Sequence, residues 1–176
     1  AEMKKVMSKF YRPPGSMLSY MAKEIEKKGI AVSRARMVIG GADLLGDYER
    51  SYIEKMFDAP LYDQYGCNEL EVLAWQCQEK QEYHIDADTV VMEFVDEEGE
   101  RVAPGETGEI VCTSLFNYAM PFIRYDTKDI GLPSKKKCPC GRGLPVMDAI
   151  EGRIPDILIT PNGKYLTHNF FVFFFE

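Results

Sequence analysis

The sequence has no excess of positive charge and no long apolar run. It contains 21 lysine and arginine residues against 28 acidic residues, which gives a net charge of −7. This acidic balance argues against nonspecific nucleic-acid binding, which requires clustered cations. No stretch is apolar over the length that a transmembrane helix needs, and residues 1–10 lack the apolar segment of a signal peptide. The sequence therefore predicts neither nucleic-acid binding nor membrane insertion.

Cysteine and histidine are scarce, with five and two residues respectively. An odd number of cysteines without the spacing of a disulfide scaffold fits a reducing compartment, so we expect a cytoplasmic protein. Both ends of the chain read as interrupted, because residues 1–10 open without a helix cap and residues 170–176 form an apolar run followed by nothing. We therefore expect this chain to be part of a longer protein.

Four of the seven cysteine and histidine residues form one candidate metal site: Cys77, His84, Cys138 and Cys140. Three thiolates and one imidazole are the ligand set of a closed tetrahedral Zn²⁺ site. Cys138 and Cys140 flank a proline and precede Gly141, which can take a positive φ and close a tight turn. The alternative is a set of ordinary reduced thiols with His84 as a plain strand residue.

Apolar periodicity predicts an α/β arrangement in residues 1–70. We expect a helix from Ser16 to Gly29, a strand over 35–39, a helix over 47–57 and a strand over 60–65. A strand, a helix and a second strand between residues 35 and 65 form a βαβ unit, in which the two strands are parallel.

Residues 71–160 have the pattern of a β-rich, barrel-like subdomain, and 161–176 would begin a truncated hinge segment. Short strands recur at regular spacing, which is typical of antiparallel β structure. The expected strands are 71–76, 82–85, 89–95, 109–115, 121–124, 129–132 and 157–160.

Two glycine-containing segments follow the predicted parallel strands, where open α/β sheets bind ligands. The first is Gly40, Gly41 and Ala42; the second runs from Tyr65 through Gly66 and Asn68 to Glu69. Glycine at such a place lets a ligand approach the backbone. Tyr65 could equally belong to the core, and Glu69 could equally be a carboxylate at a helix start.

Two later segments carry charged groups suited to a nucleotide. Asp129 ends the stretch 121–129 and offers a bidentate acceptor for two ribose hydroxyls, and Arg153 follows Gly152 as a candidate ribose or phosphate contact. The alternatives are a surface charge cluster around Asp129 and a peripheral salt bridge for Arg153.

Four motifs in this order resemble the adenylate-forming, AMP-producing acyl ligases, particularly the branch of phenylacetate–coenzyme A ligases and capsular-polysaccharide ligases. The motifs are YGCNE (65–69), GETGEIVCTSL (105–115), PFIRYDTKDIG (121–131) and GRIPDILITPNGK (152–164). The segment CPCGRGLP (138–145) and the spacing from Cys77 to His84 are also similar to that branch. The resemblance implies the large-domain fold of these enzymes.

The resemblance also implies roles for individual residues. Gly40, Gly41 and Ala42 would form part of the adenine pocket, with Tyr65 and Gly66 near the adenine and acyl groups. Asn68 stands where the family has threonine at the α-phosphate, and Glu69 would help to hold Mg²⁺. Asp129 would bind the ribose hydroxyls, and Arg153 would begin the hinge to the mobile C-terminal domain.

The implied reaction is ATP-dependent formation of an acyl-AMP from an aryl or related acid, followed by transfer of the acyl group to coenzyme A. Pro155 stands where the family often has aspartate. We expect the family's phosphate-binding loop and catalytic lysine to lie outside this chain, and the chain alone to be inactive. A different class of function, a zinc-stapled module that binds a nucleotide or a protein without catalysis, stays open, as does the oligomeric state.

Overall fold

The chain folds into two compact units, one ending at Gln64 and the other beginning at Tyr65. A computed structural model describes residues 10–32, 35–79, 82–153, 158–161 and 165–166. Each unit has its own apolar core and is described separately below. Most of the predicted hinge segment, 161–176, lies outside the described residues.

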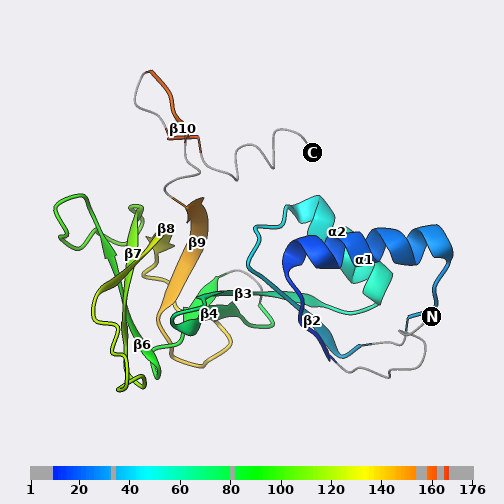
Figure 1. The fold of residues 1–176 in the computed structure, drawn as a ribbon, viewed down its shortest axis with the longest axis horizontal. Helices are drawn as coiled ribbons and strands as arrows, with labels where there is room; N and C mark the ends of the chain where they lie inside the picture. The colour runs from blue at the N-terminus through cyan, green and yellow to red at the C-terminus, as the bar shows by residue number, and fades with distance from the viewer. Residues whose placement is uncertain (1–9, 33–34, 80–81, 154–157, 162–164, 167–176) are drawn as a thin grey trace. The chain divides into compact units, whose positions relative to one another are not determined.

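The first unit is a parallel α/β structure, as the sequence predicts. Strands β1 (Phe10–Tyr11), β2 (Met37–Gly41) and β3 (Leu61–Cys67) are paired in parallel, with Phe10 opposite Met37 and Val38 opposite Leu61. Helices α1 (Gly15–Lys28) and α2 (Asp47–Phe57) lie against each other over these strands (Figure 1). Both helices match their predicted ranges closely, because their apolar residues recur at the spacing of one helix face.

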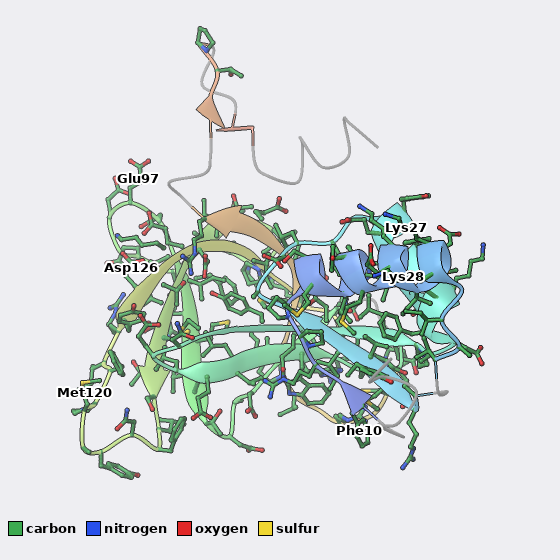
Figure 2. The ribbon with its side chains drawn as sticks, turned by 45° about the vertical axis from the view of Figure 1, so that its right-hand side comes forward. Phe10, Lys27, Lys28, Glu97, Met120 and Asp126 are labelled. Atoms are coloured by element: carbon green, nitrogen blue, oxygen red, sulfur yellow. The ribbon has the colours of Figure 1, made fainter. Side chains whose placement is uncertain are left out.

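Side chains from both helices and two strands form the core of this unit. Figure 2 shows Lys27 and Lys28 at the C-terminal end of α1, where cations stabilise the helix dipole. The core residues are Leu18, Ala22, Ile25, Ala35, Val38, Ile53, Phe57, Ala59 and Leu61.

The second unit is an antiparallel β structure, which confirms the predicted change of character along the chain. Its strands are β4 (Glu71–Gln76), β5 (Tyr83–Ile85), β6 (Val90–Val95), β7 (Gly108–Ser114), β8 (Tyr125–Pro133) and β9 (Val146–Arg153). The order in space is β4-β5-β9-β8-β7-β6. Strand β9 therefore lies between β5 and β8, which brings residues near 77, 84, 129 and 140 into one sheet. Two short strands, β10 (Leu158–Ile159) and β11 (Tyr165–Leu166), pair with each other.

The structure corrects the prediction for residues 121–132. Pro121–Arg124 is not a strand, and one strand runs from Tyr125 to Pro133 in place of the two shorter ones expected. Pro121 cannot donate to a strand ladder, and Arg124 has a φ of 48°, so the extended conformation begins only after it. The preceding loop is exposed and carries Met120 (Figure 2).

The sequence analysis did not predict strand β9 (Val146–Arg153).

The end of β3 requires a glycine at position 66. Gly66 lies so close to the following strand that a Cβ built on it would fall 2.0 Å from the carbonyl oxygen of Glu71. Because a backbone atom cannot rotate away, a side chain here forces the two segments apart. The segment that carries Asn68 and Glu69 is therefore fixed by close backbone packing at its start.

We expect Gly66→Ala to lower the free energy of unfolding by about 1–3 kcal/mol or more, the range for overpacked sites. Denaturation in urea, followed by circular dichroism, measures this change. Gly40→Ala is the matched control, because the nearest atom to its added Cβ is a leucine methyl group at 3.5 Å. Equal unfolding free energies for the two variants would contradict the argument.

Candidate functional site

The described residues of the second unit contain two polar clusters. We call the first the carboxylate cluster: Tyr65, Glu69, Tyr125, Thr127, Asp129 and Arg153. We call the second the thiol cluster: Cys77, His84, Cys138 and Cys140.

Asp129 lies at the centre of the carboxylate cluster and is 6% exposed. The Tyr65 hydroxyl donates to Asp129 Oδ2 at 2.8 Å, and Arg153 Nε donates to Asp129 Oδ1 at 3.1 Å. The segment 65–69, β8 and the end of β9 thus converge on one carboxylate. A carboxylate can accept about four hydrogen bonds, so two such donors leave acceptor positions for a ligand.

Thr127 links this carboxylate to the sheet. Its hydroxyl donates to the carbonyl oxygen of Ile110 at 2.9 Å and accepts from the Asp129 N–H at 3.2 Å. It also lies 3.3 Å from the Tyr65 hydroxyl. Burial raises the pKa of Tyr65, so its phenol keeps the proton that it donates to Asp129. The sequence analysis missed Thr127, because it did not predict that residues 125–133 form one strand.

Glu69 is exposed, and the Tyr125 hydroxyl donates to its Oε1 at 2.8 Å. This hydrogen bond lowers the pKa of Glu69, which is therefore ionised at neutral pH. Asn68 beside it is also exposed. An exposed, ionised carboxylate is suited to a hard cation such as Mg²⁺. The sequence analysis did not identify Tyr125 as its partner.

Gly40, Gly41 and Ala42 belong to the first unit. Gly40 and Gly41 are the last residues of β2 and do not follow it, and Ala42 has a φ of 68°. Asp43 next in sequence accepts a hydrogen bond from the Ser16 N–H at 2.8 Å, at the start of α1. The left-handed conformation of a non-glycine residue is uncommon and marks a constrained turn.

The thiol cluster combines all four predicted ligands. Their ligand atoms lie within 4.8 Å of one another. Cys77 follows β4, His84 lies in β5 opposite Trp75, and the turn with Cys138 and Cys140 precedes β9. The sheet order brings these three places together, since β5 pairs with both β4 and β9. Gly141 closes the turn with a φ of 77°, as the sequence predicts.

The spacing within the thiol cluster fits tetrahedral zinc. The sulfur atoms of Cys77 and Cys138 are 3.6 Å apart, and Cys140 Sγ is 3.4 Å from His84 Nε2. Ordinary zinc–sulfur and zinc–nitrogen bond lengths in a tetrahedron give about 3.8 Å and about 3.5 Å for these two edges. The donor set and these two distances therefore fit a zinc ion.

Trp75 and Arg142 cover this cluster. The Trp75 ring lies 5.1 Å from the His84 ring, and the Arg142 guanidinium carbon lies 5.4 Å from the Trp75 ring centre. The pKa of Cys140 is lowered to about 7, mainly by hydrogen bonding from the Arg142 backbone. Burial lowers the pKa of His84, which favours the neutral imidazole that binds metals. Trp75, the only tryptophan in the chain, is thus part of this cluster.

No family model matches the sequence. Phenylacetate–coenzyme A ligases are among its curated relatives. The enzyme of Thermus thermophilus is 30% identical over 145 residues, which cover 79% of this chain and 33% of that protein. The enzyme of Pseudomonas putida is 34% identical over 154 residues, covering 83% of this chain and 34% of that protein. The chain therefore spans about a third of the length of the curated relatives it matches.

Solved structures of adenylate-forming enzymes share the fold. An open conformation of 2-hydroxyisobutyryl-CoA ligase in complex with 2-HIB-AMP and CoA has a TM-score of 0.78 at 21% identity, covering 91% of this chain and 36% of that one. The amide bond synthetase McbA from Marinactinospora thermotolerans has a TM-score of 0.66 at 15% identity, covering 91% and 34%. No helix among the described residues is long and apolar enough to cross a membrane. The chain is therefore similar in sequence to phenylacetate–coenzyme A ligases over about a third of their length, and it shares its fold with 2-hydroxyisobutyryl-CoA ligase.

Proposed function

We propose that this chain is the adenylate-binding portion of an ATP-dependent carboxylate–coenzyme A ligase. One observation carries the proposal: a buried carboxylate, Asp129, is held by Tyr65 and Arg153 beside the ionised Glu69. These are the positions for which the family resemblance implied nucleotide contacts. The curated relatives named above support the acid–thiol ligase class.

Asp129 is the proposed ribose ligand. Its two oxygens each accept one hydrogen bond, from Tyr65 and from Arg153, which leaves acceptor positions for the two hydroxyls of a ribose. Tyr65 and Arg153 would hold the carboxylate in one orientation before the nucleotide arrives. A preorganised acceptor loses little conformational freedom on binding, and this increases affinity.

Glu69 and Asn68 are the proposed groups at the phosphates. The exposed Glu69 carboxylate would share in holding Mg²⁺, which binds proteins through one or two carboxylates together with substrate phosphates. The Asn68 side chain carries amide donors suited to a phosphate oxygen. Gly40, Gly41 and Ala42 keep their predicted role in the adenine pocket, supported by the constrained turn at Ala42.

The proposed reaction has two steps. In the first, an oxygen of the substrate carboxylate attacks the α-phosphorus of ATP, and pyrophosphate leaves. In the second, the coenzyme A sulfur attacks the acyl carbon, a thioester forms and AMP leaves. The protein's part would be to position the nucleotide and to neutralise charge on its phosphates. An aryl or related acid is the proposed substrate class.

A structural Zn²⁺ in the thiol cluster completes the proposal. Cys77, His84, Cys138 and Cys140 would occupy all four positions of a tetrahedral ion and leave none for water. Such an ion would cross-link the end of β4, the strand β5 and the turn before β9. It would stabilise the sheet that supports Asp129 and take no part in the chemistry.

Acid-dependent exchange of labelled pyrophosphate into ATP tests the function. The experiment uses the longest natural chain that contains these residues, with a panel of aryl and aliphatic acids. We expect exchange with one class of acid, and thioester formation on addition of coenzyme A. We expect none from the 176-residue chain alone, which matches only about a third of the length of its curated relatives. Failure of the long, folded chain to exchange with any acid would contradict the proposal.

A further inference from the structure

Two buried polar atoms beside the thiol cluster have no hydrogen-bond partner among the described residues. They are Nδ1 of His84 and Oε2 of Glu82. His84 is 0% exposed and Glu82 is 6% exposed, so neither residue is open to solvent. Buried polar atoms are nearly always paired, because an unpaired one costs free energy in the folded state. Each of these two atoms therefore requires a physical reason.

The position of the two residues suggests that reason. Glu82 directly precedes β5 and lies two residues before His84, and alternate residues of a strand point to the same face. Nε2 of His84 belongs to the thiol cluster, because it lies 3.4 Å from Cys140 Sγ. Nδ1 is on the other side of the ring and is the nitrogen left for Glu82. The carboxylate of Glu82 also raises the pKa of His84, against the larger effects of burial and of Arg142.

We infer that Glu82 is a positioning residue of the metal site and acts through His84. When Nε2 binds a metal, Nδ1 carries the proton and donates it in a hydrogen bond to the Glu82 carboxylate. This contact fixes the tautomer and the orientation of the imidazole and makes it a stronger ligand. The inference rests on the zinc site of the proposed function and extends it to a residue outside the four ligands.

The charges around the thiol cluster permit an ionised Glu82 beside His84. Three thiolates and one Zn²⁺ carry a net charge of −1, and Glu82 would add another negative charge. Arg142 supplies a cation at the same place, since its guanidinium lies over Trp75 and interacts with Cys140. A cation close to the cluster offsets part of the cost of this negative charge.

Glu82→Gln tests the inference in the longest natural chain, with competition against a chromogenic zinc chelator as the measurement. The substitution keeps the size of the side chain and removes its charge. We expect the affinity for zinc to fall by about tenfold or more, as for other groups that orient a metal ligand. Glu79→Gln is the matched control, because Glu79 is an exposed glutamate two residues after Cys77. We expect it to bind zinc as the unsubstituted protein does.

Melting temperatures separate this role from a purely structural one. In the metal-free protein, Glu82→Gln should melt at the unsubstituted temperature or above it, because it removes the charge of a buried carboxylate whose Oε2 has no partner among the described residues. In the zinc-loaded protein it should melt at a lower temperature. If Glu82 only supported the fold, the substitution would shift both forms in the same direction, and that result would overturn the inference.

A third readout needs no substitution. The chain contains two histidines, so ¹⁵N-histidine NMR resolves His84 readily. We expect a zinc-bound Nε2 and a slowly exchanging proton on Nδ1. Metal on Nδ1, or unchanged zinc affinity in Glu82→Gln, would overturn the role of Glu82 and leave the zinc proposal intact. If the unsubstituted protein takes up no zinc, the zinc proposal fails, and this inference fails with it.

Discussion

Asp129→Asn is expected to reduce acid-dependent pyrophosphate exchange by about 100-fold or more in the longest natural chain. The substitution removes the charge that would accept the two ribose hydroxyls. Hydrogen bonds to a charged group contribute about 1.5–3 kcal/mol each, so the loss of two corresponds to about 10²–10⁴ in rate or affinity. It also leaves the Arg153 guanidinium, 3.1 Å from Asp129 in the structure, without its charged partner.

The control for this experiment is Asp88→Asn, which changes an exposed aspartate between β5 and β6 by the same chemistry. We expect it to keep the full rate of exchange. The concentration of ATP that gives half-maximal exchange should rise in Asp129→Asn, because the proposed role is nucleotide binding. If Asp129→Asn exchanged at the rate of Asp88→Asn, the ribose contact would be refuted, although the fold and the family would stand.

Cys138→Ser is expected to lose the bound zinc and to melt more than about 10 °C lower. Structural zinc contributes directly to folding, and a serine hydroxyl does not replace a thiolate ligand. For a chain of this size each kcal/mol corresponds to about 2–4 °C, so a loss of several kcal/mol produces a shift of this size. Zinc content by atomic absorption and thermal unfolding by circular dichroism measure the two effects.

Cys67→Ser is the matched control, since Cys67 lies outside the thiol cluster. Its zinc content should match that of the unsubstituted protein. The fluorescence of Trp75 is an independent signal, because the ring is 5.1 Å from His84 and responds to changes at the metal site. Unchanged zinc content and melting temperature in Cys138→Ser would show that these four residues do not hold a structural ion.

The sequence predicted the elements with strong periodicity and missed those without it. Helices α1 and α2 were correctly located because their apolar residues repeat at helical spacing. Strand β9 was missed because the segment 146–153 mixes apolar, acidic and glycine residues and has no clear alternation. The strand predicted at 121–124 was wrong because its apolar residues belong to an exposed loop that Arg124 ends in a left-handed conformation.

The candidate ligands of the thiol cluster were predictable from the sequence because zinc chemistry depends on residue type. Three cysteines and a histidine are conspicuous in a chain with few of either. The groups that assist them were not predictable in the same way. Glutamate, arginine and tryptophan occur at many surface positions, so only the fold distinguishes these three. Trp75 lies beside His84, Arg142 lies over Trp75, and Glu82 is buried.

By itself the sequence determined the change from α/β to β-rich structure, the candidate metal ligands and the candidate carboxylates, because these depend on periodicity and on chemical type. The tertiary structure alone decided which groups meet. The pairing of β9 with both β5 and β8 brings Cys138 and Cys140 to His84, and Arg153 to Asp129. Contacts of this kind join residues far apart in the chain, and no local pattern contains the register of strands that creates them.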